Sequence, residues 1–270
     1  MNIKKRLLPA ALIVILTVGC TLLSRPTRVL FFAALAWVSV LELRNVLSEA
    51  GIELDAPLMC GYIAGQTVLC MVGARGVWMI ALYALAAFAV MLSGILRPEN
   101  GAKRAVGTLF ALVWPFGFYA IVLHAAASEV WLPVLALSVL SAWACDSMAL
   151  IGGKLCGKHK LAPKVSPNKT WEGALIGAAF SVPAGYLIHL MLKSTCYVPA
   201  LVCMIIALVS SSFGQLGDLA ASLIKRMAGV KDYGHLMPEH GGIMDKTDSM
   251  LFAIPAAYLL LYVFGLFGMG

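Results

Sequence analysis

Acidic residues are scarce in this chain, so the positions of the few in its C-terminal half are informative. Asp218 begins a stretch in which Ser222 and Lys225 follow four and seven residues later, with Arg226 directly after them. If this stretch is helical, Asp218, Ser222 and Lys225 share one face. Carboxylates bind magnesium together with substrate phosphates, while lysine and arginine neutralise phosphate oxygens. The pattern therefore favours chemistry on phosphate groups.

A second polar group occupies residues 231–248. Asp245 and Asp248 are three residues apart, so a helix that begins there presents both on one face, although acids in a first turn also complement the helix dipole. Gly241 and Gly242 allow a tight turn whose backbone N–H groups can approach a phosphate. The other candidates in this segment are Lys231, Asp232, His240 and Lys246. We interpret the histidine as a phosphate contact or a structural residue, because no cysteine stands at a spacing that fits a common zinc site.

Two further candidate regions lie upstream. Asp146 stands near the end of an apolar run, where it either faces a polar cavity or reaches the lipid headgroups from a helix end. Ser166, Asn168 and Thr170 stand where they can cap the helix that follows them. A helix N-terminus beside Lys169 favours phosphate binding, and a basic loop that sets membrane topology is the alternative.

These side chains must be held by helices in a lipid bilayer. Hydrophobic residues make up 61% of the 270-residue chain and charged residues only 12%, so a soluble fold could not cover this surface. We therefore predict an all-α fold, a polytopic transmembrane bundle of about nine spans. The apolar runs place the spans near 7–23, 29–48, 57–73, 76–96, 105–127, 130–151, 173–192, 197–217 and 249–268. No soluble basic face with aromatic platforms is seen in the sequence, so nucleic-acid binding is not expected.

The basic residues predict how the chain is oriented. With the N-terminus in the cytoplasm, 16 of the 20 lysines and arginines fall on cytoplasmic segments and only 4 outside, as the positive-inside rule requires. Basic residues before the run 7–23 are also typical of a signal peptide, but further spans follow directly, so we expect a retained helix. We expect N-terminal transmembrane helices over 1–128 and a catalytic region with cytoplasmic loops over 129–270, within one continuous membrane domain.

The C-terminal motifs resemble those of a known family. Ser222-Leu-Ile-Lys-Arg is followed by Lys231-Asp-Tyr-Gly and then by Met237-Pro-Glu-His-Gly-Gly-Ile-Met-Asp. This order is similar to the signature of the phosphatidate cytidylyltransferases, also called CDP-diacylglycerol synthases. Asp146-Ser147, the block 166–173 and Gly217-Asp218 are similar too, so the resemblance covers about residues 140–250. Two positions depart from the family pattern, namely Met237 in place of Leu, Ile or Phe, and Lys246 in place of Arg.

The resemblance implies transfer of a cytidylyl group from CTP to phosphatidic acid, which gives CDP-diacylglycerol and pyrophosphate in phospholipid biosynthesis. It implies Mg²⁺ as cofactor, with a second cation left open, and membrane lipid as partner, with a homodimer left open. As a hypothesis we assign catalytic roles to Asp218, Lys225, Arg226, Asp245 and Asp248. We assign metal binding to Asp146, Asp218, Asp245 and Asp248. We assign substrate contacts to Ser166, Asn168, Lys169, Ser222, Lys231, Asp232, His240, Gly241, Gly242 and Lys246.

Three alternatives remain open at this point. The lipid substrate could carry isoprenoid-ether or polyprenyl chains, because the first half of the sequence does not reveal chain selectivity. Lys246 keeps the charge of arginine but loses its planar fork, which leaves an inactive relative open. A transporter without chemistry is disfavoured, because the acids gather at one expected face and no repeat symmetry is seen. The location that we expect is a bacterial inner membrane, with the active site on the cytoplasmic side.

Overall fold

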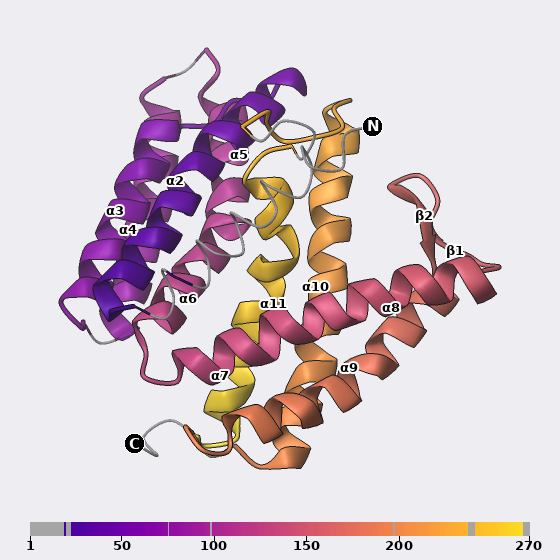
Figure 1. The fold of residues 1–270 in the computed structure, drawn as a ribbon. Helices are drawn as coiled ribbons and strands as arrows, with labels where there is room; N and C mark the ends of the chain where they lie inside the picture. The colour runs from indigo at the N-terminus through magenta and orange to yellow at the C-terminus, as the bar shows by residue number, and fades with distance from the viewer. Residues whose placement is uncertain are drawn as a thin grey trace. The chain divides into compact units, whose positions relative to one another are not determined.

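The structure, a computed structural model, describes residues 19, 23–74, 76–97, 99–196, 198–236 and 241–266. The chain forms two compact units (Figure 1). Unit 1 contains Met1–Ser128 and Met227–Lys246, and unit 2 contains Glu129–Arg226 and Thr247–Gly270. A boundary between units therefore falls within the first turn of the last helix.

Unit 1 is a bundle of apolar helices. Its helices are α2 (Arg25–Glu49), α3 (Ala56–Met71), α4 (Gly76–Ile95), α5 (Gly101–Val113) and α6 (Phe116–Ala127). Helix α2 packs against α3 and α6, and α4 packs against α3 and α5. Buried side chains such as Phe32, Leu43 and Tyr119 fill the interior. The Ser39 hydroxyl lies 2.8 Å from the Tyr119 hydroxyl, so this buried polar pair satisfies itself.

Arginines satisfy carbonyl groups at the C-terminal ends of two helices in unit 1. Arg25 donates to the Cys70 carbonyl at the end of α3, with an N–O distance of 2.6 Å. Arg28 donates through Nε to the Ala126 carbonyl near the end of α6, at 3.0 Å. The last carbonyls of a helix have no partner within the helix, and cations also complement the dipole there. Both arginines stand in the first turn of α2, so they anchor that helix to its neighbours.

The expected fifth span is divided in the structure. Helix α5 ends at Val113 and α6 begins at Phe116, with a cis Trp114–Pro115 peptide between them. A proline has no N–H to donate and its ring clashes with the preceding turn, so it interrupts a helix. The prediction of one continuous helix over 105–127 is therefore wrong, although α5 and α6 together are long and apolar enough to cross a membrane.

Unit 2 combines helices with one short hairpin in the residues that the structure describes. Its elements are α7 (Trp131–Leu135), the π-helical turn η1 (Ala136–Leu140), α8 (Ser141–Cys156), β1 (Lys160–Ala162), β2 (Ser166–Thr170), α9 (Trp171–Leu192), α10 (Ala200–Met227) and α11 (Met244–Val263). The strands pair antiparallel, with Lys160 opposite Thr170. Pro163 lies in the hairpin turn and Pro167 in β2, where the missing N–H of proline interrupts no helix.

Glycines allow α8 and α9 to lie side by side (Figure 1). A methyl group added at Gly177 would lie 2.5 Å from the Cys145 carbonyl oxygen. One added at Gly173 would lie 2.6 Å from the carbonyl oxygen of Ala149. In lipid, helices associate through close packing of small residues and not through a hydrophobic driving force. These glycines therefore fix the distance between the two helices that flank the hairpin.

The π-helical turn leaves a carbonyl that the neighbouring helix satisfies. Ser210 on α10 donates to the Leu137 carbonyl at 3.2 Å, and Ser141 on α8 also donates to it. A π-turn disturbs the regular ladder of helix hydrogen bonds, and an unsatisfied carbonyl is costly in lipid. The hydroxyl of Ser210 therefore ties α10 to the irregular turn.

The protein is a multi-pass integral membrane protein. Among the residues that the structure describes, six helical segments are long and apolar enough to span a bilayer: Arg25–Glu49, Gly76–Ile95, Gly101–Ala127, Trp131–Cys156, Trp171–Leu192 and Ala200–Met227. Helix α4 shows the pattern most clearly, because most of its large apolar side chains are uncovered by protein. Examples are Ile80, Phe88, Leu92 and Ile95. Lipid is the solvent that such a surface requires.

Several predicted boundaries need correction. The eighth predicted span ends at residue 217, whereas α10 continues to Met227 through a segment that mixes charged and polar residues with apolar ones. The sixth continues to Cys156, and the last helix begins at Met244 instead of 249. The third predicted span, near 57–73, agrees with α3 (Ala56–Met71) to within two residues. Most of the predicted first span, 7–23, lies outside the described residues.

Candidate functional site

Three charged side chains from three elements gather in unit 2. Lys169 on β2 forms an ion pair with Asp218 on α10, between Nζ and Oδ2. Asp146 on α8 lies within electrostatic range of both. The side chains of Lys169 and Asp218 are 26% and 35% exposed, so water and ligands can reach the pair. The structure therefore brings together three of the predicted site residues.

The hairpin that carries Lys169 is fixed at its base by α9. The Thr170 hydroxyl accepts a hydrogen bond from the Gly173 N–H at 3.1 Å and so caps α9, as predicted. The Glu172 carboxylate accepts from the N–H groups of Lys158 and His159, at 3.1 and 3.2 Å, and lies 2.5 Å from His159 Nδ1. An acid in the first turn of a helix also complements its dipole. These contacts hold both strand ends beside the start of α9.

A further contact joins the hairpin to α10. Arg226 donates through Nε to the Val165 carbonyl in the hairpin turn, at 3.3 Å. Lys169 thus reaches from the hairpin to α10, and Arg226 reaches from α10 to the hairpin. The two contacts hold the strand against the last turns of α10. The predicted substrate residues Ser166 and Asn168 lie on the same strand as Lys169, and the Asn168 side chain is exposed.

Helix α10 carries Asp218, Ser222 and Lys225, which confirms that this stretch is helical. Because α10 continues to Met227, positions four and seven residues apart share one face. Ser222 and Lys225 are both buried in the fold, 9% and 8% exposed. A buried lysine needs a charged or polar partner, so Lys225 has a structural role within the fold. Its predicted role in phosphate binding stays a prediction.

Asp248 lies where α10 and α11 come into contact within unit 2. A methyl group at Gly217 would lie only 2.5 Å from the Asp248 carbonyl oxygen. The close approach therefore places the backbone of Asp248 beside the residue that precedes Asp218. The Asp248 carboxylate accepts a hydrogen bond from the Ser249 N–H at 2.7 Å.

Asp245 organises the loop before α11, within unit 1. Its Oδ2 accepts hydrogen bonds from the N–H groups of Tyr233 and Gly242, at 2.7 and 2.9 Å. Gly241 has a φ of +82°, and a methyl group there would lie 2.7 Å from the same oxygen. Glycine is the residue that tolerates both conditions. The approach of the Asp245 carboxylate therefore explains the glycine at position 241.

The other predicted residues of this loop differ in their surroundings. The Lys231 and Lys246 side chains are exposed, and Asp232 is half-buried. His240 lies outside the described residues. The roles assigned to these four residues stay predictions.

Sequence reasoning missed Glu42, which lies on α2 and is 6% exposed. Its carboxylate accepts hydrogen bonds from the N–H groups of Ile243 and Met244, both at 2.8 Å. The signal that could have found it is its occurrence as an acid inside an apolar span, since such residues are costly and usually functional. Its distance of some two hundred positions from its partners concealed the contact.

The carboxylates of unit 2 bear on the prediction that magnesium binds. Within the ranges that the structure describes, no three His, Cys, Asp or Glu side chains gather into a metal site. Magnesium is usually held by one or two carboxylates, with substrate phosphates and water completing the octahedron. Asp146 and Asp218 could contribute two such carboxylates, because they lie within electrostatic range of each other. Magnesium binding by them stays a prediction.

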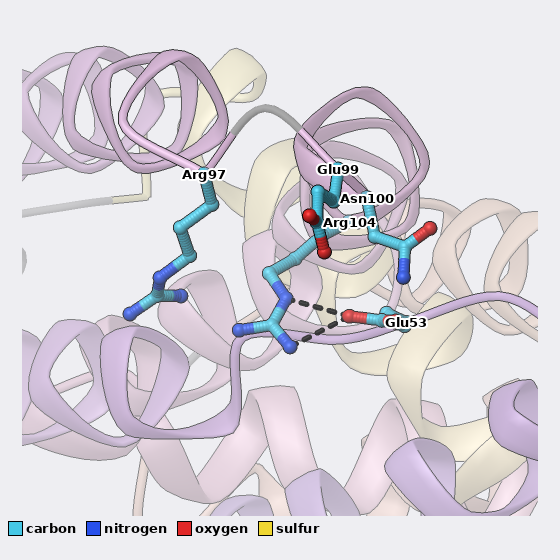
Figure 2. Close-up of a pocket in the computed structure, with 5 residues that line it drawn as sticks. All are labelled: Glu53, Arg97, Glu99, Asn100 and Arg104. Atoms are coloured by element: carbon cyan, nitrogen blue, oxygen red, sulfur yellow. Dashed lines mark hydrogen bonds and ion pairs between the residues drawn. The ribbon is translucent and has the colours of Figure 1, made fainter.

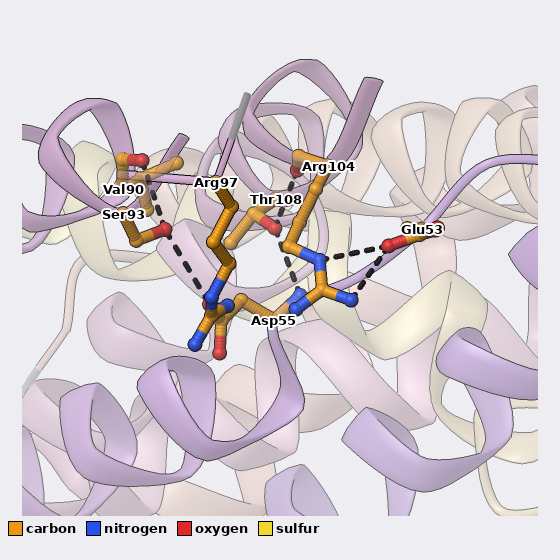
Figure 3. Close-up of polar contacts among 7 residues, drawn as sticks. All are labelled: Glu53, Asp55, Val90, Ser93, Arg97, Arg104 and Thr108. Atoms are coloured by element: carbon orange, nitrogen blue, oxygen red, sulfur yellow. Dashed lines mark hydrogen bonds and ion pairs between the residues drawn. The ribbon is translucent and has the colours of Figure 1, made fainter. Parts of the chain in front are cut away.

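Unit 1 contains a second polar cluster, around a cavity of ≈ 420 Å³ (Figure 2). The cavity is lined by Glu53, Arg97, Glu99, Asn100 and Arg104. Arg104 donates to Glu53 Oε2 at 2.8 and 2.6 Å, and Arg97 donates to Asp55 Oδ2 at 2.9 Å (Figure 3). The Thr108 hydroxyl adds a further link, since it accepts a hydrogen bond from the Asp55 N–H at 2.9 Å and donates one to the Arg104 carbonyl at 2.7 Å. Carboxylates thus already neutralise both arginines, and the cluster connects the helix ends of unit 1.

Comparison with known proteins decides the family. The sequence matches the profile of the cytidylyltransferase family over residues 4–264. A protein of Brucella abortus biovar 1 named phosphatidate cytidylyltransferase is 34% identical over 236 residues, which cover 85% of this chain and 72% of the relative. The chain belongs to the cytidylyltransferase family. The family match extends through the first half, where the motifs alone gave no evidence beyond apolar spans.

Two further relatives match a shorter stretch of the chain at higher identity. Proteins named phosphatidate cytidylyltransferase from Bacillus subtilis and Staphylococcus saprophyticus are 43% and 44% identical, over 122 and 124 residues. These matches span 45% of this cytidylyltransferase-family chain in both cases, and 45% and 46% of the two relatives. The chain is therefore matched over less than half the length of these two relatives, and over most of the Brucella one.

Proposed function

We propose that this member of the cytidylyltransferase family transfers a cytidylyl group from CTP to phosphatidic acid. The products are CDP-diacylglycerol and pyrophosphate, and the step belongs to phospholipid biosynthesis. The observation that carries the proposal is the cluster of Asp146, Lys169 and Asp218, in a chain whose family handles CTP and whose relatives are named for phosphatidate. A phosphatidate phosphate group and a nucleotide triphosphate both need such a mixture of carboxylates and cations.

The reaction requires charge neutralisation more than it requires a base. An oxygen of the lipid phosphate attacks the α-phosphorus of CTP, and the bond between the α-phosphorus and the bridging oxygen breaks as pyrophosphate leaves. The phosphate monoester is already anionic at neutral pH, so no side chain has to remove a proton from a hydroxyl. The barrier is the approach of two polyanions, which positioning and preorganised charge can lower.

We assign roles to the residues of unit 2 on this basis. Asp146 and Asp218, together with Asp248, would hold Mg²⁺, which would neutralise the triphosphate and orient it for displacement. Whether a second cation binds is a question for metal titration. Lys225 and Arg226 bind phosphate oxygens from the end of α10. Ser166, Asn168, Lys169 and Ser222 line the approach of the substrates.

The remaining predicted residues belong to unit 1, and roles are proposed for them separately. Asp245 contributes a carboxylate from the first turn of α11. Gly241 and Gly242 form the turn that holds this carboxylate, since the Gly242 N–H donates to it. Lys231 and Lys246 supply positive charge from exposed positions. Asp232 and His240 orient the loop or the nucleotide.

The membrane arrangement is part of the same proposal. We infer about nine spans, with the N-terminus and the catalytic loops in the cytoplasm of a bacterium and the protein in its inner membrane. The support is the positive-inside distribution of lysine and arginine, together with the bacterial origin of the relatives. CTP then reaches the site from the cytoplasm, while the lipid chains stay in the bilayer.

The test is release of pyrophosphate from CTP by the purified protein in lipid nanodiscs. We expect release only when both Mg²⁺ and phosphatidic acid are present, with CDP-diacylglycerol formed in equal amount and identified by mass spectrometry. Excess chelator should stop the reaction, and added Mg²⁺ should restore it. Absence of pyrophosphate under all these conditions would refute the proposed reaction.

A lipid series tests the substrate. Phosphatidic acids with diacyl chains and isoprenoid-ether analogues carry the same phosphate but different hydrophobic chains. Faster turnover of the diacyl lipid supports the proposal, whereas turnover of only the isoprenoid-ether lipid replaces the substrate and keeps the reaction.

A further inference from the structure

Glu42 occupies a position that an apolar span does not usually give to an acid. It lies near the end of α2, between buried residues, and its side chain is almost fully covered. Burying a carboxylate without partners is costly. Its surroundings therefore have to supply hydrogen bonds, and they come from the loop 241–244 of the same unit.

Both carboxylate oxygens of Glu42 accept backbone hydrogen bonds. Oε1 accepts from the Ile243 N–H and Oε2 from the Met244 N–H, each at 2.8 Å. These N–H groups belong to the start of α11, where the first turn has no partners within the helix. An anion at this end also complements the helix dipole. Glu42 thus caps α11 with a residue from a distant helix.

Two glycines of the loop leave the space that the Glu42 carboxylate occupies. A methyl group at Gly242 would lie 2.5 Å from both Glu42 oxygens, and one at Gly234 would lie 2.7 Å from Oε1. Any larger residue at either position would displace the carboxylate or the loop. Glu42 therefore contacts the loop at two places as well as at the helix start.

The same short segment also carries the contacts of Asp245. The Gly242 N–H donates to Asp245 at 2.9 Å, and the next two N–H groups donate to Glu42. Three successive peptide groups are thus fixed between two carboxylates. Because the Asp245 side chain leaves α11 from its first turn, its direction depends on how that turn is held.

We propose that Glu42 is a positioning residue of the active site: by capping α11 it fixes the turn that carries Asp245 in the geometry for cation and phosphate binding. The inference rests on the proposed role of Asp245 and goes beyond it, because it assigns a role to a residue on α2, outside the C-terminal motifs. Glu42 itself touches no substrate in this proposal.

The test compares Glu42→Gln with Ser39→Ala, in nanodiscs. Gln keeps the size of the side chain, but its amide nitrogen faces one of the two N–H groups. Ser39 lies one turn away on α2, and its replacement removes the buried contact with Tyr119 without touching the loop. Glu42→Asp is the conservative variant, which retains the charge with a shorter reach.

Two measurements are made on each variant. The first is hydrogen–deuterium exchange of a peptide covering 241–250, without metal or nucleotide. The second is the Mg²⁺ concentration that gives half-maximal CTP turnover. For Glu42→Gln we expect faster exchange and a rise in this Mg²⁺ midpoint of roughly 10–100-fold, the usual effect of losing a residue that orients a ligand. Glu42→Asp should lie between Gln and the wild type, and Ser39→Ala should match the wild type in both.

Unchanged exchange in Glu42→Gln would overturn the cap, and faster exchange with an unchanged Mg²⁺ midpoint would overturn the positioning role. An equal rise of the midpoint in Ser39→Ala would also overturn it, since general loosening of α2 would then explain the effect. If Glu42→Gln does not fold, the Glu42→Asp variant decides by the same criteria. A wild-type protein without turnover would refute the proposed reaction, whereas the exchange measurement would still decide the cap.

Discussion

Replacing Asp218 by Asn separates the chemical role of this carboxylate from its structural role. Asn has nearly the same size as Asp, so packing on α10 is retained while the negative charge is removed. Two consequences follow. Lys169 loses its ion-pair partner, and the proposed cation loses a ligand.

The structural consequence is small. Lys169 and Asp218 are 26% and 35% exposed, so solvent screens the pair and it contributes roughly 0.2–1 kcal/mol, as exposed pairs usually do. A loss of that size is well below the total stability of a folded protein, about 5–15 kcal/mol, so the variant stays folded. The chemical consequence is larger, since removal of one preorganised charged or polar group costs on the order of 10²–10³ in kcat, about 2.7–4 kcal/mol. Turnover and stability should therefore separate clearly.

The assay measures Mg²⁺-dependent pyrophosphate release and thermal unfolding on the same nanodisc samples. Glu53→Gln is the matched control, because its ion pair with Arg104 is similarly exposed, 31% and 38%, but lies outside the proposed site. We expect both variants to unfold within a few degrees of the wild type, and only Asp218→Asn to lose turnover. Wild-type turnover in Asp218→Asn, or an equal loss in Glu53→Gln, would refute the reasoning.

Three further substitutions test the supports of the site. Gly177→Ala places a methyl group 2.5 Å from the Cys145 carbonyl, so it should force α8 and α9 apart and cost about 1–3 kcal/mol in unfolding experiments; unchanged stability would contradict the tight packing. Thr170→Ala removes the cap of α9 and should cost about 0.5–2 kcal/mol, while Thr170→Ser should restore most of it, as measured by denaturant or thermal unfolding. Arg226→Lys keeps the charge but loses the fork that reaches the Val165 carbonyl, so the KM for CTP should rise about tenfold or more, and an unchanged KM would remove Arg226 from the substrate site.

Much of the fold could be predicted from the sequence, because hydrophobic length is a strong signal in a membrane protein. The apolar run over 76–96 corresponds closely to α4, whose large side chains are mostly uncovered. The signal failed where polar residues continue a helix past the apolar run. Helix α10 extends to Met227 because helix hydrogen bonding does not require apolar side chains outside the lipid. Pro115 had a clear local signature, but the apolar residues on both sides concealed the break.

The candidate site could be predicted in part, through residues whose spacing expresses a helix period. Asp218, Ser222 and Lys225 were found because four- and seven-residue spacings place side chains on one face. The ion pair between Lys169 and Asp218 could not be predicted, because it joins a hairpin to a helix nearly fifty residues later. The contact of Glu42 also joins distant parts of the chain. In addition, its partners are backbone N–H groups, which carry no signal in the sequence.

The glycines of unit 2 link the packing of the helices to the chemistry of the site. In lipid, two helices approach closely only where side chains are small, and α8 and α9 do so along the row that includes Gly153, Gly173 and Gly177. Asp146 lies on α8 within this contact region, while Lys169 lies on the strand that leads into α9. The spacing between the two helices therefore also sets the distance between the Asp146 carboxylate and the Lys169 cation, which the proposed function assigns to one phosphate-binding site. A larger residue in this row would change both at once, so these glycines should affect catalysis as much as stability.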